Sequence, residues 1–252
     1  MDEKVNIRWV EETDSTQDEV RRHIPEYDNL SVTAAEFQTA GRGQRGNTWL
    51  ARKGENLTFS MLALFGKDGF PPIPATRQFD LTKAATLGVA GYLETKGIEC
   101  SIKWPNDIYV RNKKICGMLI ENVLEDGFVG SSIIGIGLNV NQKDFPPGLV
   151  NPTSMSMSTG KTYDIREELE KLSASLEEWF GKFFDQSRPD GIDGFYEDRL
   201  YRKGVTCEYV LCSDGSVFEG TIIGVSPDGK LLLKKKNGEL NQFAFKEISY
   251  II

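Results

Sequence analysis

Apolar residues along the chain follow two periods, and the shorter one predicts strands over much of the first half. Runs rich in β-branched and aromatic residues predict strands at 7–10, 31–37, 57–64, 100–110, 115–124 and 128–140. Asp126 and Gly127 separate the last two runs and form a good hairpin turn, so these two strands are expected to pair.

Two longer segments have the 3.6-residue period of helices. The first covers 80–96 and stops at Gly97, and the second, 165–184, is amphipathic. An earlier helix is predicted to begin within "DSTQDEV", where Thr16 and Glu19 have the spacing of a capping box. The apolar face of the 165–184 helix consists of Leu169, Leu172, Leu176, Trp179, Phe180 and Phe183.

The pattern changes near Gly204. From there short strands alternate with Asp-Gly, Pro-Asp-Gly and Asn-Gly turns, which is typical of a small β-barrel. We therefore expect two domains, a large one over 1–200 and a small barrel over 201–252. The fold class predicted for the large domain is α/β (α+β), a mixed β-sheet flanked by helices.

Composition and charge narrow the classes of function. The 252 residues carry a net charge of −7, which argues against generic nucleic-acid binding. No apolar run approaches the ~18 residues of a spanning helix, and the charged N-terminus has no apolar signal-peptide region. We therefore expect a cytoplasmic protein that does not contact membranes. The four cysteines have neither CxxC spacing nor histidine partners, so no structural zinc site is expected.

Basic residues are nevertheless dense in two short stretches of this acidic chain. A small basic region on an acidic protein suits a small anionic ligand better than a polyanion. The residues concerned are Arg42, Arg45, Lys103, Lys113 and Lys114.

The first stretch, "TAGRGQRGNTW" at 39–49, is close to a phosphate-binding P-loop but departs from it twice. Asn47 stands where that motif has its lysine. The loop also precedes a predicted strand, whereas a P-loop precedes a helix whose N-terminus holds the phosphates. What remains is a glycine-rich loop with two arginines, which could hold a carboxylate or phosphate or could be an ordinary solvated turn.

The second stretch runs from Lys103 to Asn122 and combines an aromatic residue, an amide, a carboxylate and lysines. Pro105 holds Trp104 in extended geometry, which places Asn106 and Asp107 at the start of a new strand. These groups could neutralise charge or bind metal, although turn chemistry explains them equally well. A third stretch, "IIGIGLNV", ends an apolar strand with a GxG pair that is a weak signal by itself.

Together the motifs resemble those of the biotin–protein ligases, also called biotin–[acetyl-CoA-carboxylase] ligases. The matching stretches occur in the family's order and spacing and, with the C-terminal module, extend over essentially the whole chain. They are "DSTQ" at 14–17, "QTAGRGQRGNTW" at 38–49, "KWPNDIYV" at 103–110, "KKICGMLIE" at 113–121 and "GIGLNV" at 135–140.

The resemblance implies a class II synthetase-like catalytic domain, a C-terminal SH3-like barrel and a two-step reaction. Biotin and ATP would form biotinyl-5′-AMP with Mg²⁺, and biotin would then pass to a lysine of a biotin carboxyl carrier protein. The winged-helix DNA-binding domain of some members has no counterpart here, so their repressor role is not implied. Homodimers occur in the family, so the resemblance leaves monomer and homodimer open.

The resemblance also assigns roles to individual residues. Lys114, Arg42 and Arg45 would be catalytic, and Asp107 would hold the metal. The residues implied for biotin are Ser15, Thr16, Gln38, Gly41, Arg42, Gly43, Lys114, Gly117, Gly135 and Gly137. Those implied for ATP or the adenylate are Arg42, Arg45, Trp49, Lys103, Asn106, Asp107, Lys114 and Asn139.

One position departs from the family pattern. Many members have arginine where this chain has Gln44, and that side chain helps to retain the adenylate. Here arginine stands one place later, so either Arg45 reaches the same anion or Arg42 and the lysines suffice.

Two other functions stay open at this point. A lipoate– or octanoate–protein ligase shares the catalytic fold, although "KWPND" and "GRG" favour biotin. The second alternative is a sensor that binds biotin without turnover. The presence of the family's central lysine, Lys114, argues against it.

Overall fold

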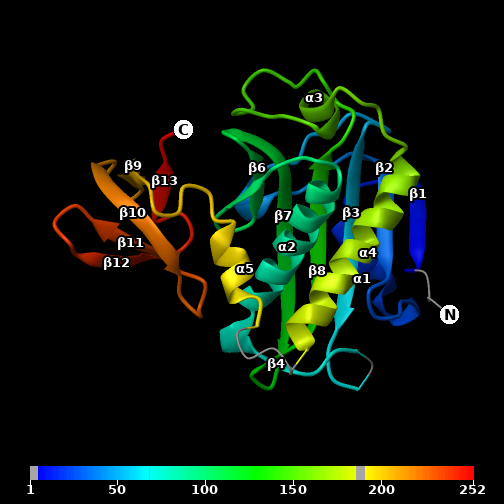
Figure 1. Cartoon of the computed structure of the whole chain (residues 1–252). Coiled ribbons are helices and arrows are strands. Elements are labelled where there is room, and N and C mark those ends of the chain that lie inside the picture. Colours follow the sequence, from blue (N-terminus) through cyan, green and yellow to red (C-terminus); the bar gives the residue numbers. More distant parts are fainter. Residues whose placement is uncertain (1–4, 68, 186–190) are drawn as a thin grey trace.

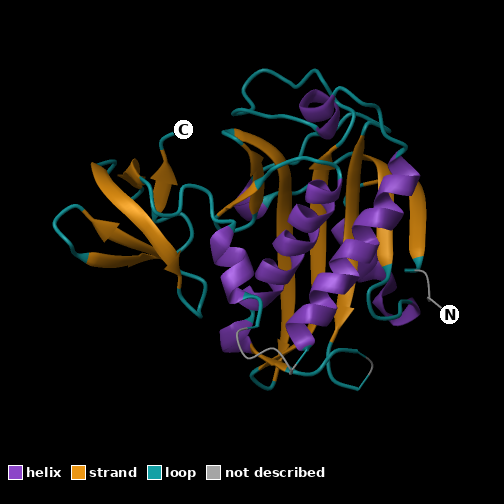
Figure 2. Cartoon of the chain, in the orientation of Figure 1, coloured by secondary structure: helices purple, strands orange, loops and turns teal. Residues whose placement is uncertain are grey.

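The computed structural model describes residues 5–67, 69–185 and 191–252, apart from the side chain of Arg45. A large sheet and a smaller one lie side by side, with helices packed on the large sheet (Figures 1 and 2). The large sheet has the order β1-β2-β3-β8-β7-β6-β5, with β4 paired to β8. Its strands are β1 Ile7–Thr13, β2 Val32–Gln38, β3 Asn56–Leu64, β4 Ile73–Pro74, β5 Ser101–Lys103, β6 Asp107–Val110, β7 Lys113–Glu125 and β8 Phe128–Asn139.

The large sheet is mixed, as predicted. Strands β1 and β2 pair in parallel, whereas every other pairing in this sheet is antiparallel. The β7–β8 hairpin turns at Asp126 and Gly127, both with positive φ, which is the geometry of a type I′ turn. None of the helices in the described part of the chain combines the length and hydropathy needed to cross a bilayer.

Strand alternation gives the large sheet two different faces. One face sends Leu57, Phe59 and Met61 of β3 into the main core, where α2 and α4 cover them (Figure 1). The other face sends Leu62 of β3 against Val20 of α1. The helices are α1 Thr16–His23, α2 Phe79–Thr95, α3 Met155–Thr159, α4 Ile165–Phe184 and α5 Asp193–Asp198, with 3₁₀ turns at Ile24–Glu26, Gln44–Gly46 and Ala75–Arg77.

Helix α4 has the boundaries that its apolar period predicted, and its first turn is closed by a side chain. Asp164 accepts hydrogen bonds from the backbone amides of Arg166 at 2.9 Å and Glu167 at 3.0 Å. These are two of the amides that a helix leaves without an internal partner.

We therefore expect Asp164→Ala to lower the free energy of unfolding by about 1 kcal/mol, the usual cost of losing such a cap. Urea denaturation measures it. Asp164→Asn keeps an acceptor oxygen and should stay close to the parent protein. If both variants were equally destabilised, the loss would lie in charge and not in capping.

The C-terminal strands form a five-stranded antiparallel sheet of order β12-β11-β10-β9-β13, consistent with an SH3-like domain. This part of the chain contacts the segment before β6, where Trp104 donates its indole N–H to the carbonyl of Gly229 at 2.9 Å. Gly229 also lies against the ring of Phe79. The strands are β9 Thr206–Leu211, β10 Val217–Val225, β11 Leu231–Lys235, β12 Leu240–Phe243 and β13 Ile248–Tyr250.

The capping box predicted at Thr16 was wrong. Helix α1 has Ser15 at its N-cap, and Thr16 is already helical. The first amide of the helix is satisfied by another chain segment, because Gln38 accepts from Thr16 N at 2.8 Å. The sequence also gave no sign of β4, α3 and α5, which are too short to show a period.

Candidate ligand-binding site

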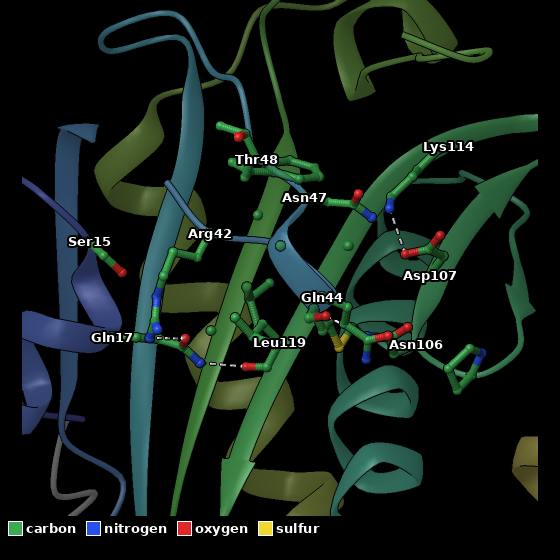
Figure 3. A pocket seen from close by; sticks show the side chains of 18 of the residues that line it. Ser15, Gln17, Arg42, Gln44, Asn47, Thr48, Asn106, Asp107, Lys114 and Leu119 are labelled. Carbon is green, nitrogen blue, oxygen red and sulfur yellow. Dashed lines mark hydrogen bonds and ion pairs between the residues drawn. The ribbon is translucent and has the colours of Figure 1, made fainter. Parts of the chain in front are cut away.

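A cavity of about 160 Å³ lies against the face of the large sheet that carries α1. Its walls come from the start of α1, the 41–49 loop, strands β7 and β8, and the 103–107 segment (Figure 3). These parts are far apart in the sequence and meet here because β3, β8 and β7 are neighbours in the sheet.

Glycines make the floor of the cavity flat, so that the indole ring of Trp49 lies directly on the strands. Gly117 and Gly137 are paired across β7 and β8. A Cβ at Gly137 would stand 2.2 Å from the indole of Trp49, and one at Gly117 would stand 3.1 Å from the same ring. A Cβ at Gly135 would stand 3.0 Å from the amide of Gln17. Absence of side chains is therefore what shapes this floor.

One end of the cavity carries hydroxyl and amide groups. Ser15 and Thr16 are buried at the start of α1, and Gln38 ends β2 beside them. The Thr16 hydroxyl lies 2.9 Å from the Ser60 hydroxyl, and Gln38 uses its oxygen on Thr16 N. This end offers neutral hydrogen-bonding groups to a ligand.

The other end carries charge. Lys114 Nζ lies 2.6 Å from Asp107 Oδ1, and its ammonium is 5.8 Å from the centre of the Trp49 ring (Figure 3). Lys103 lies nearby with its ammonium over the rings of Tyr250 at 4.6 Å and Tyr109 at 5.3 Å. Burial lowers the pKa of Lys103, and Asp107 opposes that shift. Two ammonium groups and one carboxylate leave an excess of positive charge at this end.

Asp107 is the one carboxylate among the described residues that line the cavity. Mg²⁺ is commonly bound by one or two carboxylates together with substrate phosphates. One carboxylate at the end that carries the lysines fits this donor pattern, and Asp107 is the residue that would hold such an ion. Asn106, next to Asp107, is buried. Its side-chain amide donates to the carbonyl of Met118 and therefore holds the backbone of β7.

Arg42 lies at the end away from Lys114 (Figure 3). Its guanidinium donates to Glu121 at 2.9 Å and to Gln17 at 3.1 Å, and lies 3.4 Å from Asp18. The cation predicted to contact the adenylate is thus paired with protein carboxylates in this structure.

Two polar atoms in the cavity wall have no hydrogen-bond partner in the described part of the chain. They are the side-chain oxygen of Gln44 and the indole N–H of Trp49, both buried. Buried polar atoms are normally paired, so a bound ligand is a natural partner for them. In the sequence, Gln44 was noted only because many family members have arginine at that position.

Most predicted site residues line this one cavity. Two do not: Gly41 lines a neighbouring cavity, and Asn139 is buried and donates its amide to the carbonyl of Thr153 at 2.9 Å. The side chain of Arg45 lies outside the described residues. The predicted residues that line the cavity are Ser15, Thr16, Gln38, Arg42, Gly43, Trp49, Lys103, Asn106, Asp107, Lys114, Gly117, Gly135 and Gly137.

Sequence reasoning missed part of the wall. Phe245 reaches the cavity from the turn between β12 and β13 and meets Trp104 edge to face at 6.1 Å. Gln17 and Leu119 were inside the matching motifs but were given no role. The thiol of Cys116 neighbours the site, and burial raises its pKa, which suits a packed thiol and not a nucleophile.

Comparisons with known proteins identify the family of the chain. Residues 9–139 match the biotin/lipoate A/B protein ligase family. The bifunctional ligase/repressor BirA of Bacillus subtilis is 32% identical over 216 residues, which is 82% of this chain and 62% of BirA. BirA of Escherichia coli is 30% identical over 245 residues, covering 94% of this chain and 71% of BirA.

A solved structure supports the same relationship. The biotin protein ligase of Aquifex aeolicus in complex with biotin and ATP is 29% identical, with a TM-score of 0.75 and 97% of both chains covered. The chain spans 62% of the length of the Bacillus relative. With more than half of its residues matched, the chain belongs to the biotin/lipoate A/B protein ligase family, among the biotin–protein ligases.

Proposed function

We propose that this protein is an ATP-dependent biotin–protein ligase. It joins biotin and ATP into biotinyl-5′-AMP and then transfers biotin to a lysine of a biotin carboxyl carrier protein. The observation that carries the proposal is the polarity of the cavity. Neutral hydrogen-bonding groups stand at one end and the Lys114–Asp107 pair at the other, across a glycine floor.

This arrangement suits a ligand with a neutral polar head and an anionic tail. Biotin has such a form, with a ureido ring and a carboxylate. Ser15, Thr16 and Gln38 would hydrogen-bond the ring, and Trp49 would cover its apolar part. The tail would then point toward Lys114.

Adenylation brings the biotin carboxylate and three phosphates together, so charge neutralisation dominates the first step. Lys114 would hold the carboxylate oxygen and an oxygen of the α-phosphate as the bond between carboxylate and phosphorus forms and pyrophosphate leaves. Magnesium, when bound at Asp107, would supply further neutralisation of the phosphates. Lys103 would add charge from the side of Tyr109 and Tyr250.

Transfer requires that the acyl adenylate meet the acceptor amine before water. The 41–49 loop and Phe245, in the turn between β12 and β13, border the cavity and would limit the access of water. The acceptor lysine then attacks the acyl carbon, AMP leaves with the bonding electrons, and the amine loses a proton.

The decisive experiment is intact-mass spectrometry of a carrier domain incubated with this protein, ATP, Mg²⁺ and biotin. We expect a biotin-sized increase at the carrier lysine that disappears without ATP. Parallel reactions contain lipoate or octanoate, since the family includes ligases for lipoate. A gain only with those acids would contradict the choice of biotin, and tight biotin binding without any transfer would favour a sensor.

A further inference from the structure

Four charged side chains form a network of ion pairs at the end of the cavity that carries the hydroxyl and amide groups. Arg42 and Arg21 share Glu121 Oε2, at 2.9 and 2.7 Å. The same two guanidinium groups share Asp18 Oδ1, at 3.4 and 2.5 Å. The network therefore joins the 41–49 loop, through Arg42, to helix α1 and to strand β7.

The charges in this network cancel, because two arginines face two carboxylates. No positive charge is left over to attract an anionic ligand, in contrast to the end that holds Lys103 and Lys114. All four side chains are also partly exposed, between 31% and 47%. A binding site for phosphate is therefore a poor explanation of Arg42 in this position.

Gln17 links the network to the cavity floor. Its amide nitrogen donates to the carbonyls of Leu119 at 2.6 Å and Ile133 at 3.3 Å, which fixes the side chain across β7 and β8. Its oxygen then accepts from Arg42 at 3.1 Å (Figure 3). Arg42 is thus held by a rigid amide as well as by carboxylates.

The loop that Arg42 anchors also carries Gln44 and Trp49, whose unpaired polar atoms belong to the cavity wall. Backbone hydrogen bonds within the loop link the position of Arg42 to the positions of the residues that follow it. Gly43 N donates to Asn47 O at 2.7 Å, and Trp49 N donates to Gly41 O at 2.9 Å. Anything that releases Arg42 should therefore loosen the wall that covers a ligand.

We propose that Glu121 is a positioning residue that acts through Arg42, and that this ion pair latches the 41–49 loop over the bound acid. Asp18 and Arg21 complete the latch. The inference rests on the proposed function for the identity of the acid, biotin. The latch sets how long the ligand stays and leaves the chemistry at Lys114 unchanged.

The test measures biotin release in the absence of ATP, by a chase with excess competitor. Glu121→Gln should release biotin about two to five times faster, the effect expected for a partly exposed ion pair. Turnover at saturating biotin should stay within about twofold, so that the change appears in KM and not in kcat. Glu125→Gln, an exposed carboxylate on the same strand, is the matched control and should change neither.

A double-mutant cycle shows whether Glu121 acts through Arg42. In an Arg42→Met background, Glu121→Gln should add nothing to the release rate. An unchanged release rate in Glu121→Gln, or an equal effect in both backgrounds, would overturn the proposal.

Hydrogen exchange of the 41–49 amides in ligand-free protein tests the latch without any substrate. Faster exchange is expected in Glu121→Gln, and unchanged exchange would also overturn the latch. If the parent protein bound no biotin while this exchange difference held, the proposed function would fail and the latch would stand.

Discussion

Lys114→Ala is expected to slow adenylate formation by about 100- to 1000-fold while leaving the protein folded. The size follows from the cost of removing one preorganised donor that meets developing charge. Lys114 is partly exposed and pairs with Asp107 at 2.6 Å, so its loss opens no hole in the core. Single-turnover formation of biotinyl-5′-AMP measures the effect, and thermal unfolding checks the fold.

The neighbouring lysine gives a matched control. Lys113 is exposed on the same strand and does not line the cavity, so Lys113→Ala should keep its rate within about twofold. If Lys114→Ala formed the adenylate at a rate near that of the parent protein, Lys114 would have no role in the chemistry.

The sequence predicted most of the fold because its long elements have clear periods. The large sheet repeats apolar and β-branched runs, and the 165–184 helix presents one apolar face, so local pattern and final structure agree. Short elements such as β4 and α5 fell below the length at which a period can be read. The Thr16 cap failed for a different reason, because Gln38, from a distant strand, satisfies the helix amide.

Most residues that the family resemblance implied for the site line one cavity, but the ion pairs and hydrogen bonds among them were not predicted. The matching motifs lie on the adjacent strands β6, β7 and β8, which brings their glycines, Lys114 and Asp107 to one cavity. The partners of Arg42 come from α1 and β7, and no local pattern reveals that Glu121 and Asp18 meet there. Phe245 was missed because it depends on how the C-terminal sheet docks.

Gly137→Ala is expected to weaken biotin binding by about 10- to 100-fold. The added Cβ would stand 2.2 Å from a ring carbon of Trp49, and β8 is held in place by pairing with β3 on one side and β7 on the other. The indole must therefore shift, and overpacking of this kind typically costs about 1–3 kcal/mol. Calorimetric titration with biotin measures the loss, alongside thermal unfolding.

Two further variants locate the cause of that loss. The nearest atoms to a Cβ at Gly130, on the same strand, belong to the flexible carboxylate of Glu125, so Gly130→Ala should bind biotin normally. Trp49→Leu removes the ring that the new methyl group strikes. If the clash is the cause, Gly137→Ala should cost much less in the Trp49→Leu background than in the parent, a coupling that a double-mutant cycle measures. An equal cost in both backgrounds would mean that the methyl group meets the ligand itself and that Trp49 is not held by the glycine floor.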